Sequence, residues 1–147
     1  MERHFDLYEH QAQYYETDQM GIIHHSNYIR WFEEARTNLL DQMGFGYAKM
    51  EESGVIVPVL AINCIYKSMV RYNDRVYIIP KIEDFNGIRL TISYRIVDKA
   101  TGELRTTGES KHCFLNKENR PFSLKKEQPK LYDLFDSYLK VDLSIPK

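Results

Sequence analysis

The most regular hydrophobic pattern in the chain begins at Ser26 and repeats every three or four residues. Its apolar positions are Tyr28, Trp31, Phe32, Ala35, Leu39 and Met43. This spacing places them all on one face of an α-helix. Ser26 or Asn27 can cap the start of the helix, and Gly44 follows the last apolar residue as C-terminal glycines commonly do. The pattern therefore predicts one long amphipathic helix that begins at residue 26.

After Pro58 the period changes to the two-residue alternation that is typical of strands. Apolar and polar residues alternate over 75–82 and again over 88–96, and Asn86-Gly87 between them favours a tight hairpin turn. A second turn over 99–102 leads into a strand over 103–115. These short connections predict neighbouring antiparallel strands.

Two further elements lie near the ends of the chain. Mixed alternation and several aromatic residues over 5–15 predict a first strand. Pro129 opens a short amphipathic helix whose apolar residues are Leu131, Leu134, Phe135 and Tyr138. Residues 1–147 contain no internal repeat and no linker-like composition, so we expect a single domain. Its class is α+β, with a curved antiparallel sheet around one long helix and a short C-terminal helix.

Composition and charge narrow the function. The 147 residues are 43% hydrophobic and 28% charged, and the formal net charge is −1. This near-neutral balance does not favour nucleic acid or anionic membranes as partners. The N-terminus lacks the apolar segment of a signal peptide, and the longest uncharged stretch, 54–65, is too short to span a bilayer. Cys64 and Cys113 form neither a disulfide framework nor a zinc motif, so we expect a reducing, cytoplasmic location.

The residues that carry chemistry lie between the first strand and the long helix, over 14–28. This loop offers a carboxylate at Asp18, a flexible backbone at Gly21 and an imidazole at His25, beside the helix start. Free N–H groups at a helix start favour negative charge, including the oxyanion of acyl transfer. The Asp18 carboxylate, seven residues before His25, can act as base or nucleophile on the same carbonyl.

The same stretch resembles the signature of the 4-hydroxybenzoyl-CoA thioesterase family, which has the hotdog fold. The matching residues are Thr17-Asp18, Gly21, Ile22-Ile23, His25, Asn27-Tyr28, Trp31-Phe32-Glu33 and Ala35-Arg36. The chain departs from the family pattern at Glu16, where aspartate is commoner, at Met20, and at His24, where an aromatic residue is usual. Weaker similarity continues to about Pro121, through Tyr66-Lys67-Ser68 and the turn over 116–121.

The resemblance implies a hotdog domain that hydrolyses an acyl-CoA, with a short-chain or aromatic acyl group, to free acid and CoA. It implies Asp18 as the acidic catalyst and the His25 backbone N–H as the donor to the carbonyl oxygen, with the His25 side chain orienting substrate or water. Gly21 and Tyr28 are expected to contact substrate. No metal and no organic cofactor are expected.

Two further expectations concern the cations that bind the CoA phosphates and the oligomeric state of the protein. The phosphates of CoA need positive charge, and the candidates are Lys67, Arg71 and Arg89. One helix and a sheet with an exposed edge are too little to enclose a CoA thioester. We therefore expect a homodimer, or a homotetramer built from two dimers.

Several alternatives remain open from the sequence. The same loop would serve an acyl-ACP thioesterase, and a non-catalytic acyl-CoA-binding hotdog protein would share the fold. Without the motif, Asp18 would be interpreted as a turn residue and His25 as a surface histidine. Glu33, in the second turn of the helix, is interpreted as a solvated acid that the helix dipole favours.

Overall fold

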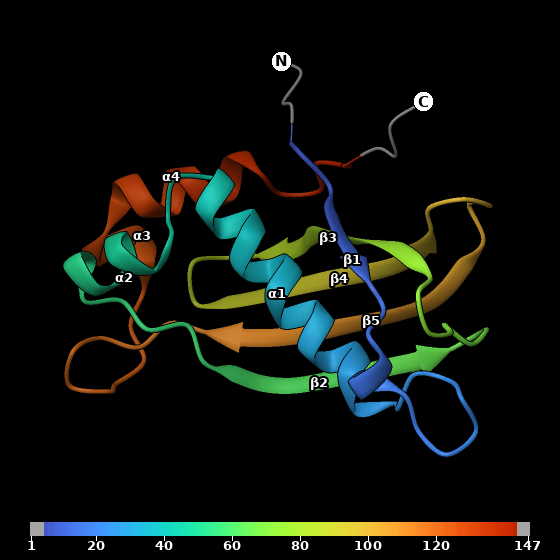
Figure 1. Cartoon of the computed structure of the whole chain (residues 1–147). Helices are drawn as coiled ribbons and strands as arrows, with labels where there is room; N and C mark the ends of the chain where they lie inside the picture. The colour runs from blue at the N-terminus through green and yellow to red at the C-terminus, as the bar shows by residue number, and fades with distance from the viewer. Residues whose placement is uncertain (1–4, 144–147) are drawn as a thin grey trace.

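The computed structural model describes residues 5–143, which form a five-stranded antiparallel sheet with helices on one face and at one end (Figure 1). The strand order is β1-β3-β4-β5-β2. The strands are β1 (Tyr8–Gln11), β2 (Val59–Tyr66), β3 (Arg75–Phe85), β4 (Arg89–Asp98) and β5 (Leu104–Cys113). The helices are η1 (Tyr14–Glu16), α1 (Ser26–Gln42), α2 (Tyr47–Ser53), α3 (Leu124–Glu127) and α4 (Pro129–Ser137). The α+β class is confirmed, and none of these helices is long and apolar enough to cross a membrane.

Helix α1 lies across the sheet and buries the predicted apolar face, in which Trp31 and Phe32 are fully buried. The Phe32 ring stacks on the Tyr94 ring of β4, with 4.5 Å between centroids. Gly108 of β5 makes room for this contact, because a Cβ there would lie 2.5 Å from Phe32 Cε2. Gly44 follows the helix with a positive φ of 89°, as expected for a C-terminal glycine. The central contact between helix and sheet therefore depends on a large ring and an absent side chain.

The start of α1 differs from the prediction. Neither Ser26 nor Asn27 caps the helix, since the N-cap position belongs to His25 and no side chain caps it there. Instead the Ser26 backbone N–H donates to His24 Nδ1, at 3.2 Å. The Asn27 side chain turns away from the helix end and donates to the Glu16 carbonyl, at 3.0 Å. The preceding loop therefore supplies the contacts that a capping side chain would make.

The predicted hairpins are confirmed. Asn86 Oδ1 accepts hydrogen bonds from the backbone N–H groups of Ile88 and Arg89, and Gly87 has a φ of 87°. This turn joins β3 to β4 in an antiparallel register. The turn after β4 is held by Asp98, which accepts from the Ala100 and Thr101 N–H groups.

The remaining elements differ in part from those that the sequence pattern predicts. The first strand is shorter than predicted, because β1 ends at Gln11 and the chain then forms the short 3-10 helix η1. Helix α4 begins at Pro129 as predicted and buries Leu131 and Phe135. Helices α2 and α3 were not predicted, and with α4 they gather at one end of the sheet (Figure 1). The description of a sheet around one helix with a short C-terminal helix is therefore incomplete.

A chain of polar groups runs through the core beneath α1. Arg36 Nη1 donates to the Tyr94 hydroxyl at 3.0 Å, and that hydroxyl lies 2.6 Å from Ser110 Oγ. Ser110 Oγ lies 2.7 Å from His112 Nε2, and His112 Nδ1 lies 3.2 Å from the Pro58 carbonyl oxygen. Every polar atom is paired if His112 is neutral, with its proton on Nδ1. Burial, together with the nearby Arg36 cation, lowers the His112 pKa from 6.5 to about 4.

We predict that His112 makes the protein less stable as the pH falls. The folded protein keeps His112 neutral down to about pH 4, whereas the unfolded chain takes up a proton below its ordinary pKa of 6.5. The free energy of unfolding should therefore fall by about 2 kcal/mol, from this group alone, between roughly pH 7 and pH 5. Urea denaturation of the wild type and of His112→Gln at both pH values measures it. Equal losses in the two proteins would contradict the prediction.

Candidate active site

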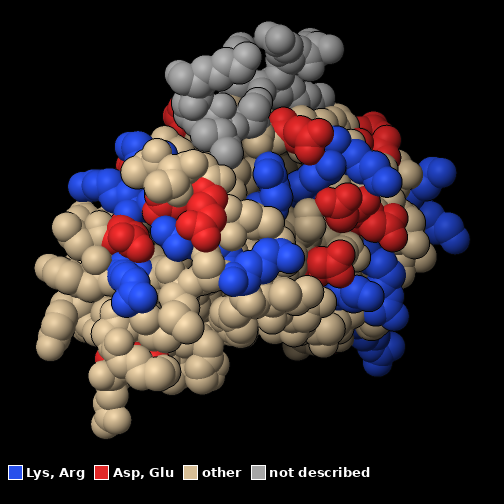
Figure 2. Space-filling model, turned by 90° about the vertical axis from the view of Figure 1, so that its right-hand side faces the viewer, with Lys and Arg blue, Asp and Glu red and all other residues tan. Residues whose placement is uncertain are grey.

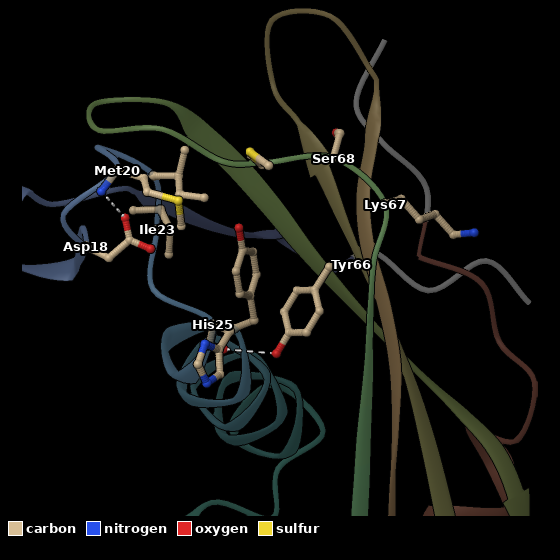
Figure 3. Close-up of a pocket in the computed structure, with 10 residues that line it drawn as sticks. Asp18, Met20, Ile23, His25, Tyr66, Lys67 and Ser68 are labelled. Carbon is tan, nitrogen blue, oxygen red and sulfur yellow. Dashed lines mark hydrogen bonds between the residues drawn. The ribbon is translucent and has the colours of Figure 1, made fainter.

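A cavity of about 280 Å³ opens where the loop before α1 meets the end of β2 (Figure 3). Its lining residues are Asp18, Met20, Ile22, Ile23, His25, Tyr28, Tyr66, Lys67, Ser68 and Met69. They come from the loop over 18–25, the first turn of α1 and the segment that leaves β2. The wall is mostly apolar, with a single carboxylate.

A tight turn over 18–21 presents that carboxylate. The Gly21 N–H donates to the Asp18 carbonyl at 3.1 Å, and the Asp18 N–H donates to the Ile22 carbonyl at 2.8 Å. Gly21 has a φ of 77°, which other residues rarely adopt, and a Cβ there would meet nothing within 4 Å. Glycine is therefore required by the turn itself. Gly21 does not line the cavity, although its turn holds Asp18 in place.

The two Asp18 oxygens have different surroundings. Oδ1 accepts the Met20 backbone N–H at 2.8 Å, which fixes the carboxylate within its own turn. The other oxygen has no hydrogen-bond partner within residues 5–143 and faces the middle of the cavity (Figure 3). Asp18 is half-buried, so this oxygen lies at the boundary between the apolar wall and solvent.

The first turn of α1 lies beside the same cavity. Each backbone N–H from Ser26 to Tyr28 donates to His24 or to His25. In the described part of the chain, the His25 N–H has no acceptor. The His25 ring is exposed and stacks on the His24 ring, 4.2 Å away between centroids. The helix start therefore offers one free donor near the cavity, with the positive end of the helix dipole behind it.

Two tyrosines form the inner wall. The Tyr66 hydroxyl donates to the His25 carbonyl at 3.2 Å, and burial, with a hydrogen bond to Cys64, raises the pKa of Tyr66 to about 12. The Tyr28 hydroxyl accepts the Val70 N–H at 3.3 Å, and burial raises its pKa as well. Both hydroxyls are therefore neutral at physiological pH. They tie the helix start to β2 and to the segment after it.

This arrangement suits acyl transfer to water. It combines a carboxylate with a free oxygen, an unpaired N–H at a helix start and an apolar wall. Within residues 5–143, no group of three His, Cys, Asp or Glu side chains is placed to hold a metal ion.

Comparison with known families shows which superfamily the chain belongs to. Residues 13–135 match the family model described as the thioesterase-like superfamily, which is most of the chain. This chain belongs to the thioesterase-like superfamily.

Relatives within the superfamily are similar over most of their length. A Bacillus subtilis (strain 168) protein named "Putative acyl-CoA thioesterase YneP" is 37% identical over 90% of this chain and 96% of its own. The acyl-CoA thioester hydrolase YbgC of Escherichia coli O157:H7 is 30% identical over 58% of this chain and 64% of its own. The crystal structure of a DHNA-CoA thioesterase from Staphylococcus aureus is 34% identical, with a TM-score of 0.82, over 89% of this chain and 88% of that chain.

The structure brings only some of the predicted site residues together. Asp18, His25, Tyr28 and Lys67 line one cavity. Arg71 lies beside it through a bridge between its backbone and that of Ile22. The side chains of Lys67 and Arg71 make no ion pair within residues 5–143, so both cations are available.

Arg89 lies apart from the cavity in this chain. It pairs with Cys113 at one end of β5, whereas Tyr66 pairs with Thr106, seven residues away along the same strand. That offset corresponds to roughly 23 Å. Arg89 and Lys67 therefore cannot hold the same phosphate within one chain, and a cluster that includes Arg89 would need a second chain.

The sequence did not assign a site role to Tyr66, Ser68 or Met69. Tyr66 and Ser68 lie in a stretch that resembles the family, and this was the available signal. Met20 and Met69, which line the cavity, are exposed, and Tyr14, Tyr15 and Tyr72 are exposed in neighbouring segments of the chain. Figure 2 shows the side of the molecule that lies at the right in Figure 1, where charged side chains gather across the middle and on the right, and the lower left is largely uncharged. The exposed part of the cavity wall that Met20 and Met69 form is therefore apolar.

Proposed function

We propose that this chain is an acyl-CoA thioesterase, which hydrolyses a short-chain or aromatic acyl-CoA to free acid and CoA at the Asp18 cavity. The observation that carries the proposal is the shared cavity of the free Asp18 oxygen and the His25 helix start. The names of the relatives supply the substrate class, since YbgC is an acyl-CoA thioester hydrolase and the Staphylococcus aureus structure is a DHNA-CoA thioesterase.

In the proposed reaction, the thioester carbonyl oxygen accepts the free His25 N–H, which stabilises the negative charge that develops on it. Asp18 acts in one of two ways. As a general base it takes a proton from water, whose oxygen bonds to the carbonyl carbon as the carbon–sulfur bond breaks. As a nucleophile it bonds to that carbon first while the carbon–sulfur bond breaks and the CoA thiolate leaves, and water then hydrolyses the mixed anhydride to the free acid and the Asp18 carboxylate. The His25 side chain, at the rim, orients substrate or water.

The size and the lining of the cavity favour a short or aromatic acyl group. Its volume of about 280 Å³ is close to the lower end of small-molecule sites, and Met20, Ile23 and Tyr28 give it apolar and aromatic walls. The finer resemblance to 4-hydroxybenzoyl-CoA thioesterases is part of this proposal, as is the cytoplasmic location. A panel of acetyl-, hexanoyl- and benzoyl-CoA, with released thiol measured optically, identifies the preferred acyl group.

A homodimer is part of the same proposal. Strand β2 is at an edge of the sheet, and every residue from Val59 to Tyr66 is at least partly exposed. Leu60 and Ile65 expose 48% and 58% of their surface, which is unusual for an edge strand whose outer side is unpaired in one chain. A second copy at this edge would cover both the free backbone groups and the apolar side chains, next to Tyr66 in the cavity wall.

We predict that Asp18→Asn lowers kcat for acyl-CoA hydrolysis by about 10²–10⁴-fold. Asparagine keeps an oxygen that can accept the Met20 N–H, so the turn should persist while the base or nucleophile is lost. Asp133→Asn, on the exposed surface of α4, is the matched control and should retain full activity. Residual activity above about a tenth of wild type in Asp18→Asn would overturn the catalytic assignment.

We predict that Leu60→Lys together with Ile65→Lys converts the dimer to a monomer with little activity, because charge on an edge strand opposes pairing. Light scattering after size exclusion measures the mass. Ile88→Lys is the matched control, since Ile88 is also 48% exposed but lies in the β3–β4 turn. A wild-type monomer with full activity would contradict the proposed assembly.

We predict that Lys67→Ala and Arg71→Ala raise KM for acyl-CoA with little change in kcat, because phosphate contacts bind ground state and transition state alike. Added salt should weaken the same substrates. A short thioester without the nucleotide is the control substrate and should show neither effect. Arg89→Ala should raise KM only if a second chain brings Arg89 to the cavity. Unchanged KM in all three variants would place the phosphate site elsewhere.

A further inference from the structure

A second carboxylate lies two residues before Asp18 and is buried. Glu16 ends the short helix η1 and exposes only 6% of its surface. Its Oε2 accepts the Trp31 Nε1–H at 2.8 Å, and its Oε1 accepts the Gln13 backbone N–H at 2.8 Å. His10 Nε2 lies 2.9 Å from the same Oε1. One side chain therefore joins β1, η1 and the second turn of α1.

The backbone of Glu16 anchors the end of the Asp18 loop that leads into α1. Its carbonyl oxygen accepts the His24 N–H at 2.8 Å and the Asn27 side-chain amide at 3.0 Å. These two donors stand on either side of His25, whose own N–H is unpaired in the described residues. A bridge between Thr17 and Ile23 closes the loop just outside Asp18. Glu16 therefore fixes both the segment that leads to Asp18 and the residues that flank the free donor.

The contacts require a carboxylate. Burial by itself would raise the pKa of Glu16, but the hydrogen bonds from His10, Gln13 and Trp31 lower it below the ordinary value. The side chain is therefore ionised at neutral pH and accepts at both oxygens. An amide of the same shape has one acceptor oxygen, and its NH₂ group would face an N–H donor at the other position. Such a replacement leaves at least one buried donor without an acceptor.

We propose that Glu16 is a positioning residue for the hydrolytic reaction. It holds the Asp18 carboxylate and the His25 N–H at a fixed separation by anchoring the loop between them to α1. This inference rests on the proposed function, because it assigns Glu16 a role in that same site. Glu16 itself contacts neither the cavity nor the substrate, since it does not line the cavity. Its effect is on geometry, and small displacements of reacting groups have large effects on rate.

The test compares Glu16→Gln with Trp31→Phe, which removes the indole donor and keeps a smaller aromatic ring at the same buried position. Glu16→Gln should lower kcat by about 10–100-fold with KM within about threefold of wild type, and Trp31→Phe should lower kcat in the same direction by less. The matched control is Glu34→Gln. Glu34 accepts from the Tyr8 hydroxyl and lies 3.8 Å from His10 but makes no contact with the loop, so its variant should keep wild-type kcat.

A double variant separates positioning from general destabilisation. If Glu16 and Trp31 act through the same contact, the double variant should lose no more kcat than Glu16→Gln alone. Additive losses, or a kcat in Glu16→Gln equal to that of wild type, would overturn the proposal.

A measurement that does not depend on activity completes the test. Amide hydrogen exchange at His24 reports the bond to the Glu16 carbonyl, and it should become faster in Glu16→Gln while exchange in β3 and β4 stays unchanged. If wild type hydrolyses no acyl-CoA, the proposed function fails, and exchange still decides whether Glu16 anchors the loop. Unchanged exchange at His24 would show that it does not.

Discussion

The contact of Phe32 with Tyr94 determines where the rest of the structure can lie. A stacked pair of rings needs the backbone of the neighbouring strand close beneath it, and Gly108 allows this because a Cβ would overlap both Phe32 and the Asn63 carbonyl. The helix is thereby fixed in height and in rotation over β4 and β5. Its first turn then falls beside the end of β2, where Tyr28 and Tyr66 pack edge to face at 5.1 Å. The candidate active site is a consequence of this placement.

Most of the fold could be predicted from local patterns, in which the residues that give the signal are close together in the sequence. The apolar period of α1, the Asn86-Gly87 hairpin and the helix start at Pro129 are local signals, and the structure contains all three. Helix α2 has no buried residue, so it leaves no apolar stripe for a pattern to reveal. Strand β1 ends early because the chain turns into η1 to bring Glu16 beneath α1, and this is a long-range requirement.

The candidate site could likewise be predicted where its residues are close in sequence, and not where they come from distant segments. Asp18, His25 and Tyr28 lie within one motif, so the sequence could group them. Tyr66 and Met69 come from the far edge of the sheet, and only the pairing of β2 with β5 brings them to the loop. The predicted phosphate-binding cations show most clearly what the sequence could not predict. Strand register separates Arg89 from Lys67 by the length of a strand, and no local pattern encodes register between distant strands.

Two carboxylates two residues apart differ in what they can do because of their surroundings. Glu16 is enclosed and has three partners around its oxygens, so its charged form is stabilised by hydrogen bonds and its oxygens are already occupied. Asp18 is half-buried and has one donor, which leaves an oxygen free at an apolar cavity. Environment commonly assigns different roles to neighbouring acids. The departure from the family pattern at position 16 is consistent with this division. The additional methylene of glutamate gives it the reach to Trp31 in the helix, while Asp18 stays on the short turn.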